Sequence, residues 1–193
     1  LRRIRQIERH RRGGEWPRSQ GQLPAAQSVG IIGLGRVGRR VARLCQAFDA
    51  KVMAHDSYVS QSPQGIELVP LEKLLAESDI VSLHLTYDAD THHLLNGETF
   101  ARMKPGAVII NTARGGLIDE TALAEALTSG QLGAAALDVF EQEPYHGPLI
   151  KCDNAILTSH IGSLARESRL RMEIEAAENL WQGLIKAGLM KDG

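Results

Sequence analysis

Five residues whose side chains could carry out chemistry lie at or just after the ends of the last three apolar runs of this sequence. They are Arg114, Asp138, Glu141, Glu143 and His160. A guanidinium offers a planar fork of donors that suits a carboxylate or a carbonyl oxygen. A histidine oriented by a carboxylate can protonate an alkoxide while a hydride arrives at carbon. These residue types predict reduction of a carbonyl group if the fold brings them together.

The elements that must position these residues are short apolar runs that alternate with helical segments. Six runs predict strands, at 29–33, 51–55, 79–85, 107–111, 133–139 and 155–159. Four segments predict helices, at 36–48, 71–78, 119–129 and 164–187, and the segment 97–103 leads into the fourth strand. Alternating strands and helices favour a parallel sheet with helices on both faces, because parallel neighbours need crossover connections. The sequence therefore predicts an α/β fold with a doubly wound, parallel six-stranded sheet (Rossmann fold), in a single domain with an N-terminal helical arm.

In that fold the fourth, fifth and sixth predicted strands are neighbours, and ligands bind beyond the carboxyl ends of the strands. Arg114, an acid and His160 would then meet at one edge of the sheet. The spacing does not decide whether Glu141 or Glu143 is the acid that pairs with the histidine. Taken alone, a single histidine such as His160 is more often a hydrogen-bonded structural residue than a working acid.

A metal centre would need further ligands at the same edge of the sheet. The other histidines lie on different predicted strands or in a loop; these are His55, His84, His92 and His93. The two cysteines, Cys45 and Cys152, are too few and too far apart for a zinc site or a disulfide framework. We therefore expect no metal site and a reducing compartment.

The predicted helix at 36–48 has apolar residues along one face, which we expect to pack on the sheet. They are Val37, Val41, Leu44, Cys45 and Phe48. The predicted helix at 119–129 has clear ends, because Asp119 suits its N-cap and Gly130 its C-terminal glycine.

A glycine-rich turn connects the first predicted strand to the first helix of the sheet. Gly33, Gly35 and Gly38 form the pattern G-x-G-x-x-G, which permits a tight turn, close approach of a pyrophosphate and close packing of helix on strand. Asp56 ends the next strand, 23 residues after Gly33, where a carboxylate can bind the adenosine ribose. Because Ser57 and Tyr58 follow it, with no arginine to hold a 2′-phosphate, the sequence favours NAD over NADP.

The composition favours a soluble, cytoplasmic globular protein. The chain has 193 residues, 43% of them hydrophobic, with a net charge of −1 and no apolar run long enough to span a bilayer. Residues 1–18 carry seven arginines against two glutamates, so nucleic-acid binding is an alternative for this segment. Leu1, Ile4 and Ile7 form an apolar ridge, which favours a linker or subunit-contact helix instead.

Four ordered motifs resemble the cofactor-binding domain of the D-isomer-specific 2-hydroxyacid dehydrogenases. The motifs are VGIIGLGRVGRRVA (29–42), INTARGGLIDETALAEAL (110–127), GAAALDVFEQEP (133–144) and LTSHIGS (157–163). The resemblance extends from about residue 1 to 187. It implies that Arg114 binds the substrate, that Glu143 pairs with the histidine, and that His160 is the general acid and base.

The same resemblance implies which residues contact NAD. Arg36 and Val37 would lie along the pyrophosphate and Asp56 at the ribose. The residues expected around the nicotinamide half are Thr86, Thr112, Ala113, Arg114, Asp138, His160, Ile161, Gly162 and Ser163. The family often has proline at the position of Thr86, so the contact there is a departure from the usual pattern.

The resemblance further implies a homodimer and three segments. Residues 1–27 would form an interdomain and dimerisation helix and loop, 28–187 the NAD-binding domain, and 188–193 a C-terminal tail. The family's N-terminal substrate domain is absent from the sequence, so we expect the isolated chain to bind NAD and to turn over poorly. The alternative to an enzyme of 2-hydroxy and 2-keto acids is an NAD(H)-sensing regulatory protein like the corepressor relatives.

Overall fold

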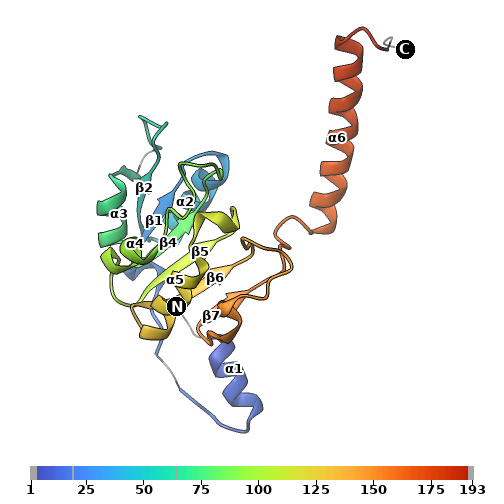
Figure 1. Cartoon of the computed structure of the whole chain (residues 1–193). Coiled ribbons are helices and arrows are strands. Elements are labelled where there is room, and N and C mark those ends of the chain that lie inside the picture. Colours follow the sequence, from blue (N-terminus) through green and yellow to red (C-terminus); the bar gives the residue numbers. More distant parts are fainter. Residues whose placement is uncertain (1–3, 19, 64, 191–193) are drawn as a thin grey trace. The chain divides into compact units, whose positions relative to one another are not determined.

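The computed structural model describes residues 4–18, 20–63 and 65–190 and contains a parallel seven-stranded sheet (Figure 1). The strands follow the order β3-β2-β1-β4-β5-β6-β7 across the sheet. Their bounds are β1 Ser28–Ile32, β2 Lys51–His55, β3 Glu67–Leu68, β4 Ile80–Leu83, β5 Ala107–Asn111, β6 Leu132–Leu137 and β7 Ala155–Leu157. This order confirms the predicted doubly wound sheet, in which the chain returns to the centre after β3 and continues outward on the other side.

The structure adds one strand to the six that the sequence predicts. The extra strand is β3, whose residues Glu67 and Leu68 pair with Met53 and Ala54 of β2. A strand of two residues is too short to leave an apolar run in the sequence, so the prediction of six strands missed it. The predicted strand at 155–159 is also shorter than expected, because β7 ends at Leu157.

The predicted helices are all present, and α4 is a helix that the sequence did not predict. The helices are α1 Ile4–Arg12, α2 Arg36–Ala47, α3 Leu71–Glu77, α4 Gly97–Arg102, α5 Glu120–Ser129 and α6 Arg166–Lys186, and the short 3-10 turns are η1 Pro24–Ala26, η2 Gly115–Leu117 and η3 Pro148–Lys151. The ends of α5 are as predicted: the Asp119 carboxylate accepts hydrogen bonds from two backbone N–H groups, and Gly130 follows in the left-handed conformation with φ 81°.

The apolar core lies on both faces of the sheet. Val29 of β1 belongs to a cluster that includes Ala42 of α2. Ile32 of the same strand belongs to a larger cluster with Leu74 of α3 and Leu123 of α5. Helices therefore cover both faces of the sheet at β1, as a doubly wound fold requires.

The predicted buried face of α2 is partly wrong. Val37, Leu44 and Phe48 are 61%, 62% and 64% exposed. The residues of α2 that are buried are Gly38 and Ala42. A Cβ atom on Gly38 would lie 2.0 Å from the carbonyl oxygen of Gly33, so α2 approaches the turn too closely for a larger side chain to fit between them.

The chain divides into two compact units, Leu1–Leu157 and Thr158–Gly193. The first contains the whole sheet, and the second contains α6. The domain limits 28–187 and 188–193 stay a prediction. Within the described residues, none of the helices combines the length and apolar composition needed to cross a membrane.

Candidate active site

The predicted site residues follow strand ends that lie side by side. Asn111 of β5 pairs with Leu137 of β6, and Leu137 pairs with Leu157 of β7. Arg114 comes three residues after the first of these strand ends, and Glu143 follows the second. The sheet therefore places the loops that carry Arg114 and Glu143 next to each other at its carboxyl edge, as predicted.

The glycine-rich turn has the shape that a dinucleotide requires. Gly33 adopts φ 94°, and a Cβ atom there would lie 2.6 Å from the backbone oxygen of His84. Gly35 is the N-cap of α2, and a Cβ atom there would meet nothing within 4 Å. The space above Gly35 and the N-terminus of α2 thus fit an anionic pyrophosphate, which would receive hydrogen bonds from the first N–H groups of the helix.

Asp56 holds this turn in place from the end of β2. One carboxylate oxygen accepts a hydrogen bond from Leu34 N at 2.7 Å. The other oxygen accepts hydrogen bonds from Tyr58 N at 2.8 Å and Val59 N at 3.2 Å. The carboxylate therefore connects the glycine-rich turn to the loop after β2 and lies where the sequence predicts contact with a ribose. The sequence did not predict its contact with Leu34.

A buried asparagine shapes the loop that carries Arg114. Asn111 is 0% exposed. Its side chain accepts a hydrogen bond from Ala113 N at 3.0 Å and donates one to Arg114 O at 2.9 Å. The guanidinium of Arg114 is exposed and donates to Ala113 O at 2.6 Å. Asn111 is a positioning residue that sequence reasoning missed, although a polar residue closing the apolar run AVIIN was the available signal.

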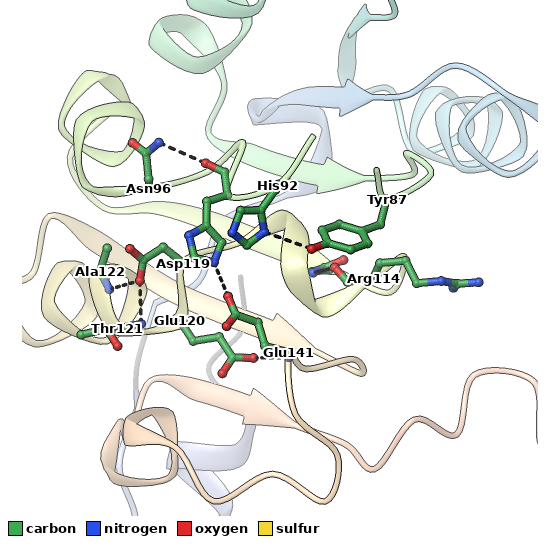
Figure 2. A network of polar contacts seen from close by, with 11 residues as sticks. Tyr87, His92, Asn96, Arg114, Asp119, Glu120, Thr121, Ala122 and Glu141 are labelled. Carbon is green, nitrogen blue, oxygen red and sulfur yellow. Dashed lines mark hydrogen bonds and ion pairs between the residues drawn. The ribbon is translucent and has the colours of Figure 1, made fainter. Parts of the chain in front are cut away.

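The two glutamates after β6 have different partners. The Glu141 carboxylate is hydrogen-bonded to the His93 ring, and the Glu141 backbone N–H donates to the Glu120 carboxylate at 2.8 Å (Figure 2). Burial raises the pKa of Glu120, and the nearby Glu141 carboxylate raises it further, against the opposing effect of that backbone hydrogen bond. Glu143 instead accepts a hydrogen bond from Phe140 N at 3.1 Å. The glutamate that pairs with His93 is therefore not the one that the resemblance assigns to catalysis.

A cavity of about 410 Å³ opens beside Arg114. It is lined by Val37, His84, Leu85, Thr86, Tyr87, Thr112, Ala113 and Arg114. Five of these were predicted to contact the cofactor: Val37, Thr86, Thr112, Ala113 and Arg114. The structure thus brings predicted pyrophosphate and nicotinamide contacts to one cavity, whereas Tyr87, His84 and Leu85 were not predicted.

His84 forms part of this cavity as a half-buried imidazole. Burial lowers its pKa below the ordinary value of 6.5. Its Nε2 atom lies 3.0 Å from the Ser82 hydroxyl. A neutral histidine at this position adds a hydrogen-bonding group to the cavity without adding a second positive charge next to Arg114.

Of the remaining predicted residues, Arg36 is the first residue of α2, and the others lie at strand ends or in the second unit. Asp138, 7% exposed, directly follows β6, and its backbone N–H donates to Asn111 O at 3.0 Å. His160 lies three residues after β7, in the second unit, with φ 55°. A non-glycine residue with positive φ is uncommon and is often found at functional sites. The pairing of His160 with Glu143 stays a prediction.

A second cavity of the described chain lies elsewhere on the sheet. A cavity of about 550 Å³ is lined by Gln46, Lys51 and Glu67, among others, and Lys51 is the first residue of β2, so this cavity lies away from the carboxyl edge. Among the described residues, no group of three or more histidine, cysteine, aspartate or glutamate side chains could hold a metal ion.

A doubly wound sheet with an open glycine turn, and with an arginine and a glutamate beyond adjacent strand ends, defines a dinucleotide-binding domain of the dehydrogenase type. The profile of the family "D-isomer specific 2-hydroxyacid dehydrogenase, NAD binding domain" matches residues 1–162. The chain belongs to this family and is an NAD-binding domain.

Known proteins similar to the chain are longer than it is. The D-3-phosphoglycerate dehydrogenase of Archaeoglobus fulgidus is 40% identical over 186 residues, which cover 93% of this chain and 35% of that protein. The glyoxylate reductase of Korarchaeum cryptofilum is 40% identical over 190 residues, covering 93% of this chain and 57% of the relative. The structure of D-lactate dehydrogenase from Aquifex aeolicus with NAD and lactic acid has a TM-score of 0.86 and 30% identity, covering 98% of this chain and 63% of that one.

Proposed function

We propose that this chain is the cofactor-binding part of an enzyme that interconverts a D-2-hydroxy acid and a 2-keto acid. The observation that carries the proposal is the position of Arg114 and Glu143 after paired strands, with Arg114 in a cavity shared with predicted cofactor contacts. An arginine at this place can bind the substrate carboxylate and polarise the carbonyl that receives the hydride. The relatives described above, named for reactions of hydroxy or keto acids, support this assignment.

Each of the three proposed catalytic residues has one task. Bound NAD would supply the chemistry of hydride transfer at C2 of the hydroxy or keto acid. Arg114 holds the substrate. His160 gives a proton to the carbonyl oxygen during reduction and takes it back during oxidation, while Glu143 orients the imidazole and stabilises its protonated form.

The proposed cofactor contacts are those predicted from the sequence. They are Gly33, Gly35, Arg36, Val37, Gly38, Asp56, Thr86, Thr112, Ala113, Arg114, Asp138, His160, Ile161, Gly162 and Ser163. We infer a preference for NAD over NADP, because the Asp56 carboxylate at the end of β2 would repel a 2′-phosphate. The open space at Gly35 and the hydrogen bond from Leu34 to Asp56 support this placement.

The proposed partners are a small 2-hydroxy or 2-keto acid and a second copy of the chain. The dimer would use the segment 1–27, which carries α1 and the exposed Trp16. The segment 28–187 would form the NAD-binding domain and 188–193 a tail. A cytoplasmic location is part of the same proposal, and the free thiols of Cys45 and Cys152 are consistent with a reducing compartment.

Hydride transfer by the full-length protein that carries this sequence tests the proposal. We expect NADH oxidation with glyoxylate, pyruvate or hydroxypyruvate. Arg114→Gln and His160→Gln should each lower kcat/KM by about 100-fold or more, while NADH still binds. Arg102→Gln, in α4 and away from the cavity, is the matched control and should retain the activity.

The result that would overturn the proposal is specific. Tight NADH binding by a full-length protein that reduces no 2-keto acid and oxidises no 2-hydroxy acid would favour an NAD(H)-sensing regulatory protein. Salt-sensitive binding of duplex DNA would instead favour nucleic-acid binding through the arginine-rich first residues.

A further inference from the structure

The cavity beside Arg114 contains a tyrosine that neither the sequence motifs nor the proposed mechanism uses. Tyr87 lies in the loop after β4 and lines the cavity together with Thr86, Thr112 and Arg114. Figure 2 shows its ring next to the Arg114 side chain. The tyrosine is 48% exposed, so its ring is neither part of the core nor free of neighbours. A phenol at this place can contact a molecule that Arg114 holds.

Three contacts fix the Tyr87 ring. A Cβ atom on Gly116 would lie 2.5 Å from Cε2 of the ring, so the ring packs directly against the backbone of η2. The hydroxyl lies 3.1 Å from Nδ1 of His92, and the two rings meet edge to face with centroids 5.9 Å apart. His92 in turn stacks on His93, with centroids 3.8 Å apart. A side chain held in this way is pre-organised, so it loses little entropy when a ligand binds.

The histidine pair is itself anchored to both neighbouring loops. His93 N donates to Gly116 O at 2.8 Å, and the His93 ring is hydrogen-bonded to the Glu141 carboxylate in the loop after β6. The backbone N–H of Glu141 is held by Glu120. These contacts thus form a row of side chains from the loop after β4 to the loop after β6, over the turn that follows Arg114. The row consists of Tyr87, His92, His93 and Glu141.

Tyr87 and His92 form one wall of the binding region, and the chemistry of this wall favours a neutral polar group over an alkyl group or a phosphate. The Tyr87 hydroxyl can donate or accept, and the His92 imidazole beside it is polar and exposed. The Glu141 carboxylate contacts the His93 ring, and the Glu120 carboxylate accepts a hydrogen bond from Glu141 N, so the two carboxylates would repel a second anionic group. A methyl group would meet this wall without a hydrogen bond, whereas a hydroxyl could make one.

We propose that Tyr87, positioned by His92, determines specificity by hydrogen-bonding a hydroxyl on C3 of the 2-keto acid whose carboxylate Arg114 holds. This inference rests on the proposed function. It makes a 3-hydroxy-2-keto acid the preferred substrate class over the same 2-keto acid with a hydrogen in place of the hydroxyl on C3.

Three 2-keto acids test the role of Tyr87 in the full-length protein. Glyoxylate has no C3, pyruvate has a methyl group, and hydroxypyruvate has a CH2OH group. Tyr87→Phe removes only the hydroxyl. It should lower the ratio of kcat/KM for hydroxypyruvate to that for pyruvate about 10-fold, the effect of one hydrogen bond. The kcat/KM for glyoxylate and the Kd for NADH should change less than about 2-fold.

Two further variants separate specificity from structure. His92→Phe keeps an aromatic ring but removes the hydrogen bond to Tyr87, so it should lower the same ratio by a smaller factor. Tyr58→Phe changes a tyrosine that is 97% exposed and does not line the cavity, and it should leave the ratio unchanged.

The outcomes distinguish this inference from the proposed function. An equal fall for all three acids in Tyr87→Phe would show a structural role, and a change confined to the Kd for NADH would show a cofactor contact; either would overturn the inference alone. In Tyr87→Phe, an unchanged ratio of kcat/KM for hydroxypyruvate to that for pyruvate would also overturn the inference alone. If the unmodified protein reduces none of the three acids, this inference is wrong, whereas the proposed function is wrong only if the protein also reduces no other 2-keto acid and oxidises no 2-hydroxy acid.

Discussion

Asp79 lies just before β4, at the edge of the sheet opposite the candidate site, and its carboxylate contributes to the stability of the fold. One oxygen accepts hydrogen bonds from Ser28 N at 2.8 Å and from the Ser28 hydroxyl at 2.7 Å, and the other accepts one from Lys104 at 2.9 Å. Burial raises the pKa of Asp79, but these hydrogen bonds and the lysine charge lower it by more, so its pKa lies below the ordinary value of 3.8. A carboxyl with a lowered folded-state pKa stabilises the protein at pH values above its unfolded pKa, and this stabilisation is lost as the pH falls through the folded pKa.

We predict that Asp79→Asn lowers the free energy of unfolding at pH 7 by about 1 kcal/mol, after allowance for partial exposure. The difference from the unmodified protein should shrink as the pH falls below 3.8.

Urea unfolding curves at a series of pH values measure this effect. Asp90→Asn, at an exposed position in the loop after β4, is the control and should follow the unmodified protein. A stability difference for Asp79→Asn that stays constant down to the acid transition would contradict the role given to its ionised form.

At the scale of the element, the turn η2 connects the candidate site to the loop after β6. Gly115 begins η2, directly after Arg114, and a Cβ atom on it would lie 1.9 Å from the carbonyl carbon of Phe140. Backbone cannot move aside as a flexible side chain can, so Gly115→Ala must push the two loops apart. We predict a loss of about 2–4 kcal/mol in the free energy of unfolding. The matched control is Gly97→Ala at the first position of α4, where a Cβ atom meets nothing within 4 Å. That variant should be neutral or more stable by up to about 1 kcal/mol, and equal effects at the two glycines would refute the close approach at Gly115.

The elements themselves were largely predictable because their signals are local. The run AVIIN and the capping residues Asp119 and Gly130 each determine a boundary from a few neighbouring residues. Burial on α2 was not predictable in the same way, since the close approach of Gly38 to Gly33 turned small residues, instead of Val37, toward the sheet.

In the candidate site, too, some residues could be predicted from local motifs and others could not. The glycine turn, Asp56 and Arg114 could be located from motifs and strand ends, because parallel strands bring their carboxyl ends together. The hydrogen bonds of Asn111 and the contact of Tyr87 with His92 depend on how loops fold back in space. No spacing in the sequence encodes such contacts, so only the structure shows them.

At the scale of the whole molecule, NADH should bind a site that spans the centre of the sheet, and binding should stabilise the entire unit that contains it. A ligand that binds only the folded state raises the free energy of unfolding by about 2.7 kcal/mol at a concentration 100 times its Kd. Gly35→Val separates binding from folding, because the space around a Cβ atom on Gly35 is open and its φ of −73° suits any residue. The variant should lose at most about 1 kcal/mol without NADH, since only the cap of α2 changes. In thermal unfolding, NADH at a concentration that raises the Tm of the unmodified chain should then leave the Tm of Gly35→Val unchanged, because the valine fills the space proposed for the pyrophosphate. An equal rise in Tm for both chains would show that the dinucleotide does not cross the turn at Gly35, and the placement of the cofactor would have to be abandoned.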